Sequence, residues 1–237
     1  DGLRNIMQSA AYHPSGVFGL NWINSAPEAT SVFFALHDSG DAIFGEIKSP
    51  AISRDIARSR LATTADGFYL AYTALLAPDA SDACATTYSI EDDLFAPKHC
   101  FSQSMESERH SIESVGVARD QPITVWSQNE PEYRTTFVTW ATETAMETYF
   151  LDYNANDFFV HDNGETSLIA WCQNPESDFM YLKIATLDPE SSTPVQIKSH
   201  RVDECKVPQI MAFNGANKLF WLSRDRLTLH YRNVCDN

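Results

Sequence analysis

Apolar and polar positions repeat five times along the chain. Each repeat has a turn rich in Gly, Pro, Asn or Asp, followed by a short apolar run that ends in Trp or Tyr. These aromatic residues follow one another at intervals of 50, 54, 45 and 50 residues: Trp22, Tyr72, Trp126, Trp171 and Trp221. The spacing is close to the length of a four-stranded propeller blade. Short runs rich in branched and aromatic side chains, bounded by turn residues, predict buried strands rather than helices.

Each apolar run predicts the second strand of a blade, and the stretch after it predicts the third. Second strands are expected at 18–22, 68–72, 123–126, 168–171 and 218–221. Third strands are expected at 31–37, 84–90, 134–141, 178–186 and 227–232. Outer strands are expected at 42–47, 146–151 and 195–200, with a poorer candidate around 93–95.

The last repeat ends after its third strand, and the N-terminal stretch 3–8 is the candidate partner that completes it. Such pairing leaves no large unpaired sheet edge. We therefore predict an all-β fold in one domain over residues 1–237. The predicted architecture is a five-bladed β-propeller of four-stranded blades, closed by pairing of the N-terminal strand with the last blade.

The chain is strongly acidic, with 32 Asp and Glu residues against 17 Lys and Arg residues and a formal net charge of −15. Such a surface repels phosphate backbones and anionic lipid headgroups, which require clustered Lys or Arg. No apolar run approaches the roughly 18 residues that a membrane-spanning helix needs. The expected partners therefore include neither nucleic acid nor an inserted membrane.

Five cysteines indicate disulfide bonds. In a propeller, the loops between second and third strands and the loops between blades lie on one face. Strand order therefore predicts the bonds Cys84–Cys100 and Cys172–Cys205, with Cys205–Cys235 as a rival to the second. Cys235 is otherwise left over, either as a free thiol or as a link to another chain. Oxidised pairs imply a secreted, periplasmic or extracellular location.

Polar side chains recur just after the second strands of repeats one, three and four, close to Pro-acid steps. We expect ligand binding by Asn24, Glu28, Gln128, Asn129, Glu132, Gln173, Asn174 and Glu176. Their amides and carboxylates would suit sugar hydroxyls on one face of the ring. The competing interpretation is that Pro shapes these turns and that the carboxylates are merely solvated.

A second candidate site lies between the third and fourth repeats. Asp152, Asn154 and Asn156 place an oxygen side chain at every second position, as at the start of a calcium-binding loop. Asp157 stands where that loop has Gly, and Asn163 where it has Glu. Calcium is therefore the one candidate cofactor.

In length and repeat number the chain resembles the tachylectin-like lectins. The resemblance implies a secreted or cell-surface module that recognises carbohydrate or a protein partner through loops on one propeller face. One alternative is a glycoside hydrolase with a carboxylate pair near the central channel, drawn from Asp55, Glu106, Glu113, Asp157 and Asp203. Another is a non-catalytic scaffold in a larger assembly. No motif singles out a catalytic pair, so binding is the leading expectation.

Overall fold

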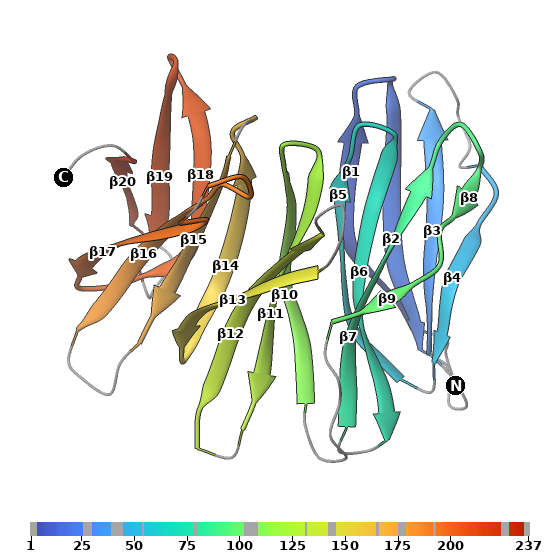
Figure 1. Ribbon diagram of the computed structural model, residues 1–237, viewed down its shortest axis with the longest axis horizontal. Coiled ribbons are helices and arrows are strands. Elements are labelled where there is room, and N and C mark those ends of the chain that lie inside the picture. The colour runs from blue at the N-terminus through green and yellow to red at the C-terminus, as the bar shows by residue number, and fades with distance from the viewer. Residues whose placement is uncertain are drawn as a thin grey trace. The chain divides into compact units, whose positions relative to one another are not determined.

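The repeated apolar runs form the inner strands of antiparallel sheets. The computed structural model describes residues 4–25, 30–38, 45–53, 55–77, 80–101, 109–130, 132–141, 146–164, 166–174, 179–191, 193–223 and 228–234. In these ranges the chain forms strands and turns and no helix. The strands make five sheets that follow one another in chain order (Figure 1).

Each sheet is a meander of consecutive strands. The first contains β1 (Arg4–His13), β2 (Val17–Ser25), β3 (Thr30–Asp38) and β4 (Lys48–Ser53). The second contains β5 (Asp55–Thr63), β6 (Gly67–Ala77), β7 (Ala80–Ser89) and β8 (Leu94–Phe95), with β9 (His99–Cys100) also on β7. The third contains β10 (Arg109–Ala118), β11 (Gln121–Asn129), β12 (Arg134–Ala141) and β13 (Met146–Tyr153). The fourth contains β14 (Ala155–Asp162), β15 (Ser167–Gln173), β16 (Met180–Leu187) and β17 (Val195–Val202). The fifth contains β18 (Lys206–Phe213), β19 (Ala216–Leu222) and β20 (Leu229–Asn233).

Among the described residues, the N-terminal strand belongs to the first sheet, and the strand order does not include the predicted pairing with the last blade. β1 pairs with β2 of its own sheet, from Arg4 opposite Ser25 to His13 opposite Val17. The tight turn between them closes with a hydrogen bond from the Gly16 amide to the His13 carbonyl. Pairing across so short a turn costs far less chain entropy than pairing with a strand some two hundred residues away.

The prediction of the first outer strand is also wrong. The expected stretch was 42–47, but residues 45–47 are not in a strand and β4 begins at Lys48. Outer strands carry little buried surface, so the apolar pattern that marks inner strands is weak there. The outer strands of the third and fourth sheets, β13 and β17, lie where the pattern predicts them.

The first strand carries a register irregularity near its start in the first, second, fourth and fifth sheets. The shifts lie between Met7 and Ser9, Ile56 and Ser59, Asn156 and Phe159, and Lys206 and Gln209. Extra residues at such bulges are unpaired in the ladder and aim their side chains away from it. The bulged residues include Gln8, Arg58, Asp157 and Val207, and several of them take part in the polar contacts described below.

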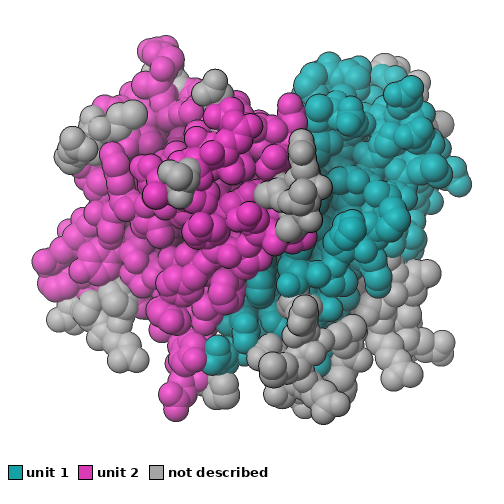
Figure 2. All heavy atoms as spheres, in the orientation of Figure 1, with its two compact units in different colours: residues 1–115, 126–131 teal, residues 116–125, 132–237 magenta. Residues whose placement is uncertain are grey.

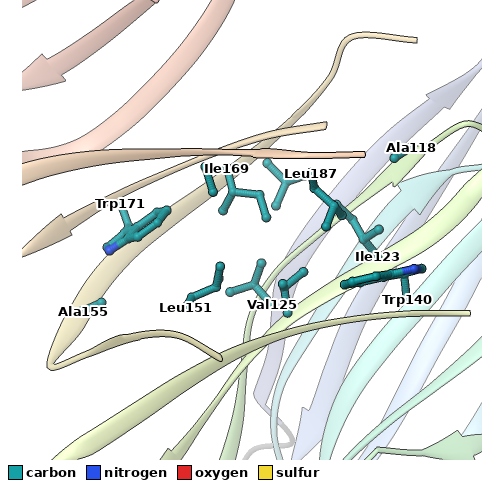
Figure 3. Packing of buried hydrophobic residues seen from close by; sticks show 12 residues of the cluster. Ala118, Ile123, Val125, Trp140, Leu151, Ala155, Ile169, Trp171 and Leu187 are labelled. Atoms are coloured by element: carbon teal, nitrogen blue, oxygen red, sulfur yellow. The ribbon is translucent and has the colours of Figure 1, made fainter. Parts of the chain in front are cut away.

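The chain divides into two compact units (Figure 2): residues 1–115 with 126–131, and residues 116–125 with 132–237. The first unit has a core between its first two sheets, which includes Phe34, Phe68 and Tyr88. The second has a core of twelve buried residues in which Trp140 and Trp171 lie at opposite ends (Figure 3). A further cluster packs the fourth sheet on the fifth. Burial of each large apolar side chain stabilises the fold by about 1.5–3 kcal/mol.

Both predicted disulfides are confirmed. Cys84 on β7 is bonded to Cys100 on β9, directly opposite in the ladder. Cys172 on β15 is bonded to Cys205, which rules out the rival Cys205–Cys235 pair. Cys235 lies outside the described residues, so its link to another chain stays a prediction. Asp82 lies within 4.8 Å of the Cys84 and Cys100 sulfurs, but sulfurs bonded to each other are not thiolate ligands for a metal.

In the part of the chain that the structure describes, no helix has the length and hydropathy needed to cross a membrane.

Candidate functional site

The predicted ligand-binding residues lie at or just beyond the ends of their strands. Asn24 is near the end of β2, Gln128 and Asn129 end β11, and Gln173 ends β15. Asn174 and Glu132 follow in the links to the next strands and are exposed. Glu28 and Glu176 lie outside the described residues. None of the described members lines the pocket around Asn163, Asn217 and Asn233 or the acidic pocket described below, so their role in binding stays a prediction.

Asp152 is a buried carboxylate of the second unit that accepts four hydrogen bonds. Its Oδ1 accepts hydrogen bonds from the Gln173 Nε2 at 2.8 Å and the Tyr153 amide at 2.9 Å. Its Oδ2 accepts from the Trp171 Nε1 and the Lys183 Nζ, each at 2.8 Å. The Asp152 side chain is 8% exposed and that of Lys183 is 18% exposed. Four donors, one of which is the Lys183 ammonium, compensate this carboxylate for the loss of water on burial.

The predicted calcium ligands have hydrogen-bond partners in the structure, and their role in binding calcium stays a prediction. Asp152 is engaged with the Lys183 ammonium, as described above. The Asn154 Oδ1 accepts from the Arg134 amide at 3.0 Å, and the Asn156 Oδ1 accepts from the Arg134 Nη1 at 2.9 Å. Calcium would have to displace an ammonium and a guanidinium, because a bound cation needs oxygen ligands that are turned toward it. Through these contacts Asp152, Asn154 and Asn156 connect the third and fourth sheets.

An acidic pocket of about 450 Å³ lies in the second unit, beside the link from β17 to β18. It is lined by Val202, Asp203, Glu204, Trp221, Ser223, Thr228 and His230. Asp203 is exposed and Glu204 is half-buried. The lining of the pocket therefore includes two acidic residues that are adjacent in sequence, in the link between the fourth and fifth sheets.

The Cys172–Cys205 disulfide holds this acidic link in place. Cys205 directly follows Glu204, is fully buried, and is tied to the end of β15. Only Asp203, Glu204 and Cys205 separate β17 from β18, so little of the link is free to move. The bond thus fixes the backbone from which both carboxylates project.

The opposite wall of the acidic pocket is aromatic and hydroxylic. Trp221 and His230 are opposite each other in the β19–β20 ladder, with rings stacked at 5.4 Å and an interplanar angle of 14°. Ser223 and Thr228 are tied together where this hairpin turns: the Ser223 amide donates to the Thr228 carbonyl, and the Thr228 amide to the Ser223 Oγ. An aromatic surface beside hydroxyls and carboxylates matches the needs of a sugar ring, which has apolar faces and a polar rim.

Asp157 lies at the bulge of β14, next to the β17–β18 link. Its Oδ2 is 3.8 Å from the Lys206 Nζ and accepts a long hydrogen bond, 3.5 Å, from the Val207 amide. Asp157 and Val207 both have left-handed backbone angles, with φ of 55° and 46°. Asp157 does not line the acidic pocket; among the candidate carboxylates whose side chains the structure describes, Asp203 does so.

The remaining hydrolase candidates are less informative. Glu106 lies outside the described residues, and only the backbone of Asp55 is described. Glu113 is buried on β10 and is paired with Arg58, as detailed below. The sequence analysis did not predict Glu204, because it belongs to no motif that recurs in the repeats. Its position between Asp203 and Cys205 was the one feature that could have indicated it.

A comparison of the sequence with models of protein families gives no match, and a comparison with curated proteins gives none either. Solved structures of similar fold include an endo-arabinase from Bacteroides thetaiotaomicron, 9% identical, covering 98% of this chain and 92% of that one, with a TM-score of 0.53. They also include an α-L-arabinofuranosidase from Lactobacillus brevis, 9% identical, covering 100% and 93%, with a TM-score of 0.52. A sialidase from Trypanosoma rangeli is 8% identical, with a TM-score of 0.57; the alignment covers 95% of this chain and 46% of the sialidase.

The fold is of the propeller type. At this level of identity the likeness establishes the fold alone. The expectation of a lectin-like recognition module is contradicted, because the structures named above are an arabinase, an arabinofuranosidase and a sialidase, and no lectin family is shown.

Proposed function

We propose that this protein is a glycoside hydrolase and that the acidic pocket is its active site. The observation that carries the proposal is the pairing of Asp203 and Glu204 with the Trp221 surface in one pocket of about 450 Å³. The propeller-type fold supports it, since structures of this fold include glycoside hydrolases. We also propose that the five sheets close into a ring of five blades, and that the protein works outside the cytoplasm, where its two disulfides would form.

The chemistry would need one carboxylic acid and one carboxylate on either side of the scissile bond. The acid protonates the departing glycosidic oxygen, while the carboxylate attacks the anomeric carbon or activates a water for that attack. Asp203 and Glu204 would divide these roles. Trp221 would stack on the face of the sugar ring, and the Ser223 and Thr228 hydroxyls lie in the pocket wall to bind its hydroxyls. The disulfide at Cys205 would keep the carboxylates at a fixed separation, which these mechanisms require.

The test is hydrolysis of a panel of glycans by the wild type and by carboxamide variants. Arabinan, an aryl α-L-arabinofuranoside and an aryl sialoside represent the activities for which the structural neighbours are named. Asp203→Asn and Glu204→Gln should each lower kcat by at least about 100-fold, because removing an acid or base costs about that much. Asp120→Asn, in an exposed turn, is the matched control and should retain full activity.

Azide distinguishes the two roles. Glu204→Ala and Asp203→Ala are assayed with added azide. Azide can replace a missing carboxylate nucleophile or base, but it cannot protonate a poor leaving group in place of a missing acid. Rescue of one variant alone would assign the roles. Absence of turnover on every substrate, or unchanged kcat in both carboxamide variants, would overturn the proposal.

Closure of the ring has its own measurement. A compact domain of 237 residues should have a radius of gyration of about 18 Å by small-angle X-ray scattering. A substantially larger value would show that the sheets do not close into one body.

A further inference from the structure

Two arginines project from the same side of β5 in the first unit. Ser59 and Leu61, which alternate with them along the strand, are buried, whereas Arg58 is exposed and Arg60 is half-buried. Arg58 belongs to the bulge between Ile56 and Ser59, and its side chain is 47% exposed. Arg60 is half-buried. This part of β5 therefore presents one accessible arginine beside one that is half-buried.

Glu113 on β10 partly neutralises this pair. Its Oε2 accepts a hydrogen bond from the Arg58 Nη1 at 3.0 Å, and its Oε1 accepts one from the Ser127 hydroxyl at 2.8 Å. The Glu113 side chain is only 7% exposed. Both of its oxygens are thus engaged, and Arg58 is held in place by a charge-assisted hydrogen bond.

Arg60 receives much less compensation. Among the described residues, its guanidinium donates through Nη1 to the Ser59 carbonyl at 2.9 Å, a neutral acceptor. Burial lowers the pKa of Arg60, the neighbouring Arg58 lowers it further, and Glu113 raises it. The described cluster thus holds two guanidiniums and one carboxylate, a net charge of one positive unit in a chain of net charge −15. A partly desolvated cation with a surplus of like charge favours an added anion.

We propose that Arg58 and Arg60 form a binding site for an oxyanion, in particular the carboxylate of an acidic sugar. The donors of a guanidinium group form a planar fork that matches a carboxylate, so one guanidinium can bind both carboxylate oxygens. The single surplus positive charge matches a monovalent carboxylate better than divalent sulfate or phosphate. Glu113 is a positioning residue, because it holds Arg58. This site belongs to the first unit and shares no residue with the acidic pocket, and binding there does not depend on the proposed hydrolysis.

The test is calorimetric titration of the full chain with D-galacturonate, D-galactose, sulfate and phosphate at low ionic strength. We expect galacturonate to bind at least about tenfold more tightly than neutral galactose, since the carboxylate adds charge-assisted hydrogen bonds. The affinity should fall as salt is raised. If sulfate or phosphate binds more tightly than galacturonate, the carboxylate assignment is overturned.

Variants locate the site. Arg60→Gln should weaken galacturonate binding by at least about tenfold, and Arg60→Lys should fall between it and the wild type because the charge remains but the fork is lost. Arg58→Gln, at an exposed position, provides the same test if the Arg60 variant does not fold, as judged by circular dichroism. Arg201→Gln, an exposed arginine of the second unit, is the matched control and should bind like the wild type.

Glu113→Gln provides a change of specificity that a merely structural role would not give. It raises the net charge of the described cluster from one to two, so the ratio of sulfate to galacturonate affinity should rise several-fold. An unchanged ratio, or equal binding of galacturonate by the Arg58, Arg60 and Arg201 variants, would overturn the proposal.

Discussion

Replacing Asp152 by Asn removes the charge from the most connected buried group of the second unit. The side chain keeps its size, but an amide has one oxygen where the carboxylate has two. At least one of the present donors, from Trp171, Gln173, Lys183 or the Tyr153 amide, would then face an N–H group. Lys183, whose side chain is 18% exposed, would also lose its counter-ion.

The expected cost of Asp152→Asn is about 3–4 kcal/mol in the free energy of unfolding, the range for breaking a buried ion pair by removing one partner. Lys183→Met should cost about 2 kcal/mol, because three neutral donors still serve the carboxylate. The double variant should be less destabilised than the sum by about 2 kcal/mol, which is the coupling between two groups in direct contact.

Urea unfolding followed by far-ultraviolet circular dichroism measures these values, with tryptophan fluorescence as a second probe. Coincidence of the two curves tests two-state behaviour, which a chain with two compact units does not guarantee. Asp120→Asn is the control and should change stability by no more than about 0.5 kcal/mol. A cost below about 1 kcal/mol for Asp152→Asn, or additive single effects, would refute the assigned role of the Asp152 network.

Three further predictions follow from buried or strained groups. The Tyr72 hydroxyl is buried without a partner among the described residues, so Tyr72→Phe should stabilise the protein by about 1 kcal/mol in urea unfolding. Burial raises the pKa of Tyr72 to about 12, so the wild type should lose stability as pH rises from about 10 toward that value, and Tyr72→Phe should lose less. Hydrogen bonds from Tyr88 and Lys48 lower the pKa of Asp93, so the stabilisation they give is present at neutral pH and is lost as pH falls below the ordinary Asp value. Asp93→Asn should therefore reduce the loss of stability below about pH 4. An acid stability profile that is unchanged in this variant would contradict the prediction. Val207 has a left-handed φ of 46° and is 39% exposed. Val207→Asn should raise the thermal midpoint of unfolding by relieving about 1 kcal/mol of backbone strain. A lower midpoint would show that the packing of the valine side chain outweighs that strain.

The sequence predicted those elements that local pattern determines. The runs ending at Tyr72, Trp126 and Trp171 are buried inner strands, as a run of apolar residues between turns requires. The two disulfides followed from strand order, because consecutive antiparallel strands fix which loops share an edge. Trp221, by contrast, is only half-buried and faces the acidic pocket, a difference its equivalent place in the repeat does not reveal.

The polar sites depended on partners that are distant in sequence. Asp152 reads as a calcium ligand from its neighbours, but its charge is matched by Lys183, 31 positions away. Likewise, nothing next to Arg58 indicates Glu113, which is 55 positions along the chain. Alternation of oxygen side chains is a local signal, whereas the counter-charge of Asp152 comes from another sheet.

At the bulges near the starts of the first strands, the chemistry of the side chain is independent of the hydrogen bonds that pair the strand. An inserted residue contributes no rung to the ladder, so changing its chemistry leaves strand pairing intact. The chain already illustrates this freedom, with an amide at Gln8, a cation at Arg58, an anion at Asp157 and an alkyl group at Val207. A combinatorial library confined to these four places would therefore vary ligand chemistry while sparing the scaffold, and it offers a direct route to engineered specificity.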